Sequence, residues 1–127
     1  MTRQHVSSGS PYEQRYGFSR ALSTGDRILV AGTAPIWPDG SCPDDAAAQT
    51  RRCFEIATAA LAEAGGSPEQ VVRTRMYITR ADIADSVGQV HGEFFAAARP
   101  VATMVVVAGL LDPRWLVEVE LEAQRQA

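Results

Sequence analysis

The segment Arg99–Glu122, RPVATMVVVAGLLDPRWLVEVELE, contains two predicted β-strands that decide the fold. The first, residues 101–108, is apolar on both alternating faces, which is typical of a strand covered on both sides. A turn segment rich in Gly, Asp and Pro follows it. The second strand, residues 115–122, alternates strictly between the two faces. One of its faces carries three carboxylates: Glu118, Glu120 and Glu122. Either these side chains lie at a solvated edge, or at least one of them faces a pocket.

The remaining pattern predicts a single domain, residues 1–127, of the α+β class. Residues 1–14 are polar and are expected to be irregular. The predicted elements are a hairpin of strands 16–22 and 27–33, a helix from 46 to 64 that Asp44 or Asp45 can cap, a strand at 71–79, a helix from about 83 to 98, and the two strands described above. The order is β-β-α-β-α-β-β, and two amphipathic helices fit one face of a mixed sheet.

The strand 71–79 divides into an apolar and a charged face. Val72, Thr74, Met76 and Ile78 share one side, whereas Arg73, Arg75 and Tyr77 share the other. An arginine on this second face could meet the carboxylates of the last strand. The opposite face of the sheet also keeps apolar residues from the strand 101–108, and a monomer would leave them in water. We therefore expect a homo-oligomer.

Composition excludes several classes of function. All twelve basic residues are arginine, so neither a Schiff-base lysine nor a P-loop lysine exists. The net charge of −3 and the scattered arginines predict no binding to nucleic acid. No apolar run is long enough to span a membrane, and the absence of an apolar leader indicates a cytoplasmic protein. The two cysteines match no metal motif, and we expect neither a metal nor a cofactor.

The chain resembles the RidA/YjgF family of reactive intermediate deaminases over nearly its whole length. The matching segments, in order, are GFSRALSTGDRILVAGTAP, QTRRCFEIATAALAEAGGSPEQVVRTRMYIT and RPVATMVVVAGLLDPRWLVEVELEA. The resemblance implies a chorismate-mutase-like fold and a homotrimer. It also implies ligand clefts between subunits, lined by the sheet face opposite the helices.

The family's functional residues carry over unevenly. Gly32 matches the glycine of its serine-glycine turn, and Glu118 matches the glutamate that positions the hydrolytic water. The arginine that binds the substrate carboxylate is replaced by Ala102, in the run Pro100-Val101-Ala102-Thr103. Phe18 replaces a tyrosine, Gly88 an asparagine and His91 a second tyrosine, while Met104 flanks the implied site. The clamp for an anionic substrate is therefore absent.

These residues predict a small-molecule protein that acts on an imine, enamine or carbonyl compound less anionic than a 2-iminoacid. Glu118 would position water or move a proton. Alternatively, Glu118 forms an ion pair with Arg73 or Arg75, and the chain is a non-catalytic module that binds a metabolite or a protein. Arg75 itself either substitutes for the lost arginine or forms a salt bridge between strands.

Two further possibilities concern histidine chemistry. His91 either shuttles a proton or has a structural role on its helix. A ribonuclease is disfavoured, since the sequence shows neither a basic groove nor a histidine pair for acid/base cleavage of RNA.

Overall fold

The structure is a computed structural model that describes residues 2–125. Six strands form one sheet in the order β1-β2-β3-β6-β4-β5. The elements are β1 (Arg3–Val6), α1 (Pro11–Tyr16), β2 (Ala21–Thr24), β3 (Arg27–Thr33), α2 (Ala46–Glu63), η1 (Pro68–Gln70), β4 (Val71–Ile78), η2 (Ala81–Ile83), α3 (Ala84–Phe95), β5 (Val101–Val106) and β6 (Val117–Gln124). Within the described residues, no helix combines the length and the apolar character that a membrane span requires.

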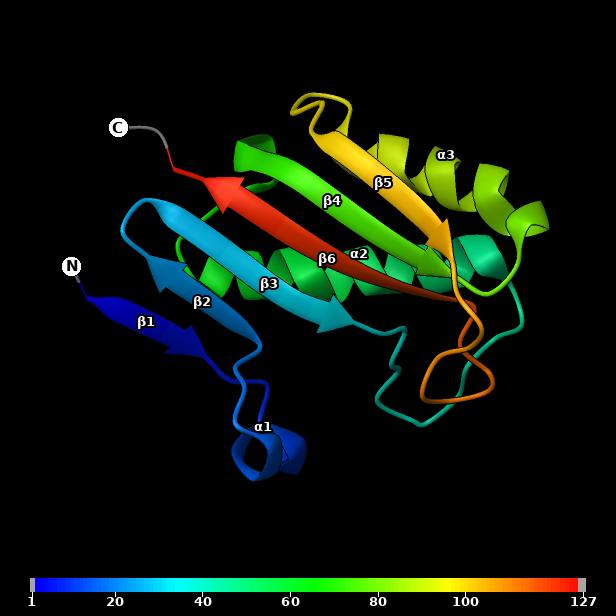
Figure 1. The fold of residues 1–127 in the computed structure, drawn as a ribbon, viewed down its shortest axis with the longest axis horizontal. Coiled ribbons are helices and arrows are strands. Elements are labelled where there is room, and N and C mark those ends of the chain that lie inside the picture. The colour runs from blue at the N-terminus through cyan, green and yellow to red at the C-terminus, as the bar shows by residue number, and fades with distance from the viewer. Residues whose placement is uncertain (1, 126–127) are drawn as a thin grey trace.

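The sheet is mixed, and the two long helices lie on the same side of it (Figure 1). All neighbouring strands are antiparallel except β4 and β5, which α3 connects as a parallel pair. Parallel neighbours need such a crossover, and a helix is the usual one. The predicted α+β architecture is confirmed. The last strand, β6, lies in the middle of the sheet between β3 and β4.

The expectation that residues 1–14 are irregular was wrong for the described part of this segment. β1 pairs with β2 at the edge of the sheet, where its polar side chains face solvent and leave no apolar alternation to detect. Residues 11–16 form α1, which begins where the Ser10 side chain accepts a hydrogen bond from the Tyr12 amide, and ends at Gly17 with φ = 76°. The predicted strand 16–22 was therefore misplaced, since β2 begins at Ala21 and continues to Thr24, inside the segment expected to be a turn.

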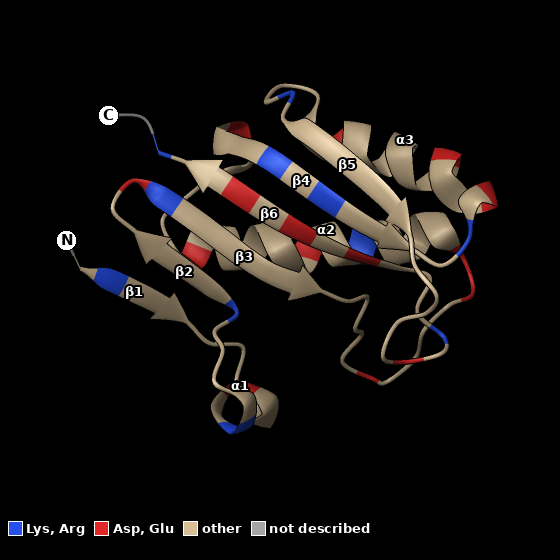
Figure 2. Ribbon diagram, in the orientation of Figure 1, with Lys and Arg blue, Asp and Glu red and all other residues tan. Residues whose placement is uncertain are grey.

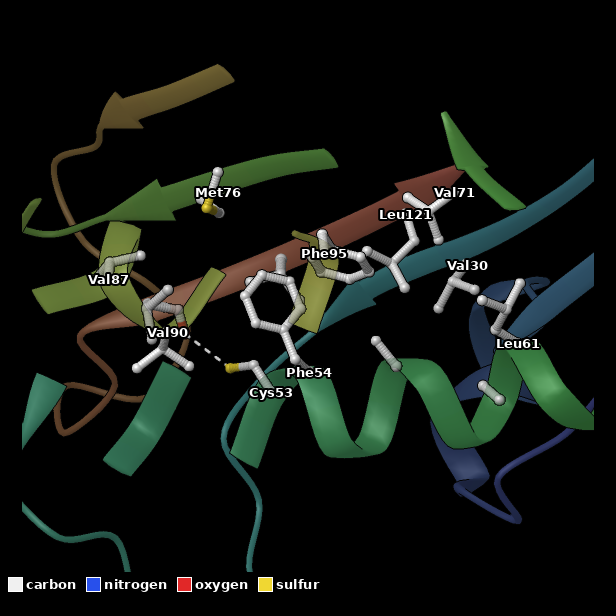
Figure 3. Packing of buried hydrophobic residues seen from close by; sticks show 14 of the residues in the cluster. Val30, Cys53, Phe54, Leu61, Val71, Met76, Val87, Val90, Phe95 and Leu121 are labelled. Carbon is white, nitrogen blue, oxygen red and sulfur yellow. Dashed lines mark hydrogen bonds between the residues drawn. The ribbon is translucent and has the colours of Figure 1, made fainter. Parts of the chain in front are cut away.

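The core lies between the sheet and the two helices, and Phe54 of α2 is at its centre (Figure 3). The Phe54 ring meets Phe95 of α3 nearly edge-on, with centroids 5.1 Å apart. The helix lengths were predicted to within a few residues, and Cys53 is buried as its position on α2 indicated. Asp45 is the N-cap residue of α2, but its side chain makes no capping hydrogen bond.

Two register shifts alter which residues face the core. One lies between Val30 and Thr33 in β3, and the other between Val71 and Arg73 in β4. The second places Val71 in the core and leaves Val72 45% exposed, although the period-2 pattern predicted Val72 on the buried face.

β5 was expected to be covered on both faces, and within a single chain it is not. It is the edge strand next to β4, and every residue of β5 except Met104 is exposed. Its apolar side chains, such as Val101 at 60% and Val106 at 56% exposure, are left in contact with water. An edge position explains this, since a strand at the end of a sheet has only one neighbour within its own chain.

Candidate functional site

The sheet face opposite the helices carries rows of opposite charge. Figure 2 shows acidic bands along β6 with basic bands beside them on β4 and β3. The acidic residues are those predicted for one face of the last strand, because Val117, Val119 and Leu121 alternate with them and are buried. Glu118, Glu120 and Glu122 therefore share the open face of the sheet with the arginines.

Glu122 is fully partnered by three arginines. Its carboxylate lies 2.7 Å from Arg27 Nη2 of β3, 3.1 Å from Arg73 Nε and 3.5 Å from Arg75 Nη1 of β4. The Glu122 side chain is only 16% exposed, so these pairs are better shielded from water than an ordinary surface salt bridge.

Glu120 is partnered as well. It accepts a hydrogen bond of 2.8 Å from the Tyr77 hydroxyl and lies 3.7 Å from Arg75 Nη1. The bond to Glu120 is the main reason that the pKa of Tyr77 is raised. Arg75 therefore pairs with both Glu120 and Glu122, so the structure supports the interpretation that it forms salt bridges between strands.

Glu118 is different, because it takes part in none of the ion pairs found within residues 2–125. The ion pair with Arg73 or Arg75 that the sequence left open is not formed. Glu118 is partly buried, and desolvation raises the pKa of its carboxyl. The charge of Arg20 lowers this pKa, whereas Glu120 raises it further. A half-buried carboxylate with a raised pKa is a stronger proton acceptor than an ordinary surface glutamate.

Gly32 provides the space for Glu118. A Cβ atom at Gly32 would lie 3.3 Å from Glu118 Oε2, which is tighter than an ordinary contact. The register shift between Val30 and Thr33 brings the two residues together, because it alters the side to which the backbone presents this position. The backbone of Gly32 and the carboxylate of Glu118 thus approach each other closely.

Sequence reasoning did not single out Arg20, which is the arginine next to this site. Its Nη2 donates a hydrogen bond of 2.6 Å to the Gly32 carbonyl oxygen, while its Nε is buried and has no hydrogen-bond partner within residues 2–125. Burial lowers the pKa of this guanidinium. The hairpin register contained the signal, since pairing Ala21 with Val30 places Arg20 beside Ala31 and Gly32.

A second group of predicted site residues lies on the helix side of β5. Ala102 pairs with Thr74 of β4, and Thr74 Oγ1 lies 2.8 Å from His91 Nε2 of α3. Burial lowers the pKa of His91, so this ring is neutral at physiological pH. The ring also packs against Phe95, with centroids 5.0 Å apart, so its contacts within the chain are structural. Met104, two residues along the same strand, packs against the core.

The two groups lie on opposite faces of the sheet. Thr74 is fully buried beneath α3, and its cross-strand neighbour Ala102 shares that face, whereas Glu118 alternates with buried residues and points the other way. A single chain therefore does not bring Ala102 and His91 together with Glu118 and Gly32.

Phe18 is 44% exposed and lies between two hollows of the surface. The smaller, about 270 Å³, extends toward His5 and Leu29. The larger, about 600 Å³, is lined mainly by aromatic and aliphatic side chains. They are Tyr12, Tyr16, Phe18, Ile36, Leu111 and Trp115. Within residues 2–125, no three His, Cys, Asp or Glu side chains gather in a way that could hold a metal ion.

Comparison with known proteins agrees with this architecture. The family described as Endoribonuclease L-PSP matches residues 10–125. An uncharacterized protein of Streptomyces coelicolor is 44% identical over 98% of this chain and 93% of its own length. A RutC family protein of Pyrococcus abyssi is 32% identical over 86% of this chain and 87% of its own.

Solved structures share the fold. A member of the YjgF/YER057c/UK114 family from Mycobacterium tuberculosis has a TM-score of 0.89 and 42% identity, covering 97% of this chain and 99% of that one. TdcF of E. coli, solved with bound serine, has a TM-score of 0.81 at 23% identity, covering 96% and 94% of the two chains. With its central β6, its two helices on one face and this match over almost all of its length, the chain belongs to the Endoribonuclease L-PSP family, which is the YjgF/RidA family.

Proposed function

We propose that this protein acts on a small imine, enamine or related carbonyl compound, and that Glu118 positions a water molecule or moves a proton in the reaction. The observation that carries the proposal is the state of Glu118. It is the carboxylate of the β6 row without an ion pair, it is half-buried, and its pKa is raised. A carboxylate needed only for structure would be expected to have a partner, as Glu120 and Glu122 do.

The chemistry that fits is hydrolysis of a carbon–nitrogen double bond. Glu118, as the carboxylate, accepts a proton from water while the water oxygen attacks the imine carbon and the nitrogen takes up a proton. In the tetrahedral adduct Glu118 returns its proton to the nitrogen, the C–N bond breaks to release ammonia, and the hydroxyl group loses its proton to solvent as the carbonyl forms, which balances the solvent proton that the nitrogen took up in the first step. Proton transfer of this kind contributes about 10²–10⁴-fold to a rate. A raised pKa brings the base closer to the pH at which it works.

The substrate is expected to carry less negative charge than a 2-iminoacid. Ala102 offers no cation for a carboxylate, and Phe18 offers an aromatic face without a hydroxyl. The hollow of about 600 Å³ next to Phe18 adds an apolar, largely aromatic wall. Such a surface favours an uncharged or apolar ligand, because burying an unpaired carboxylate there would be costly.

A cleft between subunits would complete this site. Ala102 and His91 lie near the exposed edge strand β5, and Glu118 with Gly32 lies on the opposite face of the same sheet. A second copy that covers the edge of β5 would bring Ala102 and His91 of one subunit close to Glu118 and Gly32 of the other. The homotrimer is accordingly part of the proposal, and it would also cover the apolar side chains that β5 leaves in water.

The ribonuclease label in the family description receives little support from the charges of this chain. The arginines of the open sheet face, Arg27, Arg73 and Arg75, all pair with Glu120 or Glu122. Cations neutralised in this way are poor contacts for phosphates, which RNA binding requires in numbers.

The proposal is tested by measuring ammonia release from two freshly generated imines, 2-iminobutyrate and the imine of butanone, in which a methyl group replaces the carboxylate. We expect the wild type to accelerate hydrolysis of the neutral imine above its spontaneous rate, and Glu118→Gln to lose that acceleration. Ala102→Arg should shift the preference toward 2-iminobutyrate. Glu93→Gln, on the exposed surface of α3, is the matched control and should behave like wild type.

Two outcomes would contradict the proposal. If Glu118→Gln kept the full rate, Glu118 would not be the base. If neither imine were hydrolysed faster than in buffer while the protein still bound butanone or butyrate, the chain would be a non-catalytic binding module.

A further inference from the structure

We propose a second binding site, for a small oxyanion, in the hollow between Arg20 and Arg52. This hollow has a volume of about 460 Å³ and lies between the segment 8–10, the end of β3 with the loop after it, and α2. The hollow adjoins the candidate site, since Arg20 also lowers the pKa of the Glu118 carboxyl, but Glu118 itself is not part of its wall.

The two arginines supply hydrogen-bond donors that the protein itself does not use fully. Arg20 Nε is buried and has no partner within residues 2–125, although its Nη2 binds the Gly32 carbonyl. Arg52 donates its Nε to the Ile36 carbonyl at 2.6 Å, and its Nη1 lies 3.6 Å from Glu55. Each guanidinium carries five N–H donors, so both have donors left for a ligand. A buried donor without a partner is unfavourable, and an oxyanion would remove that cost.

The charge around the hollow favours an anion. None of the residues that line it is acidic, while two are arginines. Glu13, the nearest carboxylate of the N-terminal segment, is committed to Ser8, whose amide and hydroxyl both bond to it and lower its pKa. Glu55 lies on the exposed side of α2 and does not line this hollow. The wall of the hollow is thus positively charged through Arg20 and Arg52, although Arg20 also interacts with the charges of Glu13 and Glu118, and Arg52 pairs with Glu55.

The remaining wall indicates the size and character of the ligand. Ser10 Oγ accepts a hydrogen bond from the Tyr12 amide, so its own hydroxyl proton is free to donate to a ligand oxygen. Ile36, Pro38 and Ile56 form an apolar side. Planar guanidinium groups bind carboxylates and phosphates through paired hydrogen bonds. The ligand is accordingly a small carboxylate or phosphate with at most a short apolar part.

The test is isothermal titration calorimetry with sodium phosphate and, separately, sodium butyrate, with the ionic strength held constant by sodium chloride. We expect saturable binding of at least one of them to the wild type. Arg52→Gln should weaken this binding at least tenfold. Arg51→Gln is the matched control, because the neighbouring Arg51 pairs with Glu93 of α3 and does not line the hollow.

A second variant guards against a loss of folding. Ser10→Asp keeps a residue that can cap α1 but places a negative charge in the hollow, so it should also weaken binding while α1 and the unfolding temperature are preserved. Binding of phosphate alone or of butyrate alone would support the site and identify which oxyanion it prefers. The proposal would be overturned by the absence of saturable binding, or by equal effects of Arg51→Gln and Arg52→Gln.

Discussion

Glu118 occupies the same sequence pattern as Glu120 and Glu122 and differs from them only in its neighbours. Arg73 and Arg75 lie opposite Glu122 and Glu120 in the β4–β6 register, whereas Tyr77 lies opposite Glu118 and bonds to Glu120 instead. The backbone of Gly32 faces the remaining side of Glu118. The functional carboxylate is therefore expected to be the glutamate of this row that lacks a cationic partner.

Replacing Glu118 by Gln is expected to stabilise the protein in a pH-dependent way. Because its folded pKa is raised above the unfolded value, the folded state holds more protons between the two values, and stability falls as pH rises through that window. The Gln variant has no carboxyl to ionise at this position, so its stability does not fall for this reason. It should be more stable than wild type at about pH 7 and gain little at about pH 3, below the usual pKa range of a glutamate.

The measurement is the free energy of urea unfolding at both pH values and one protein concentration. Glu93→Gln, at an exposed ion pair, serves as the control. An equal gain at both pH values would show that the charge of Glu118 is not the cause.

Gly66 is expected to tolerate no side chain. A Cβ atom there would lie 2.7 Å from Leu61 Cδ1 and 2.8 Å from Ile28 Cδ1, and both of these side chains are fully buried. Gly66→Ala should cost about 1–3 kcal/mol of unfolding free energy through overpacking. Gly92→Ala, in open space on α3, should instead gain about 1 kcal/mol from helix propensity. Thermal or urea unfolding of both variants checks the contrast, and a loss at both positions would contradict it.

At the scale of the element, β6 is held by charges from the two strands that flank it. Arg27 comes from β3, while Arg73 and Arg75 come from β4, and all three reach Glu122. One carboxylate thus joins three strands that are far apart in the sequence. A network of this kind contributes more than isolated surface pairs do.

Glu122→Gln is therefore expected to lower the unfolding free energy by about 1–2 kcal/mol, since three arginines lose their common partner. The exposed pair Arg51–Glu93 provides the comparison, and Glu93→Gln should change the unfolding free energy by less than about 0.5 kcal/mol. Urea unfolding at low and high salt distinguishes the two variants, because only the loss of unfolding free energy in Glu122→Gln should persist in high salt. Equal and fully screened effects would argue against a network.

The unusual feature of the molecule is an edge strand made of apolar residues. β5 exposes Val101, Val105 and Val106, although an exposed apolar edge favours association with another chain. The arrangement makes sense if copies of the chain meet at this edge. The same contact would place Ala102 and His91 of one copy near Glu118 of another, as the proposed function requires.

If the protein forms the proposed homotrimer, Val105→Asp is expected to shift it toward monomer, because the substitution would bury an unpaired charge between subunits. Ala62→Asp, on the exposed surface of α2, is the control for an added charge and should leave the assembly unchanged. Analytical ultracentrifugation measures both variants, and activity toward imines should fall together with the trimer. A wild type that is monomeric at all concentrations would contradict the proposed cleft.

The sequence alone determined those features that depend on geometry within one element. The period of two in VEVELE placed the three glutamates opposite the buried Val117, Val119 and Leu121, and helical spacing located α2 and α3. The resemblance to the RidA family also pointed to Glu118 and to the missing arginine at Ala102. Local periodicity carries this information because backbone dihedrals within an element are nearly constant.

The identity of the carboxylate that lacks a partner depends on contacts between strands. That choice depends on β3 and β4 as neighbours of β6, on the register shift at Gly32, and on Arg20 from another strand pair. The edge position of β5 and the formation of β1 were likewise decided by pairing. Such contacts join residues far apart in the chain, and no periodic pattern within one segment encodes them.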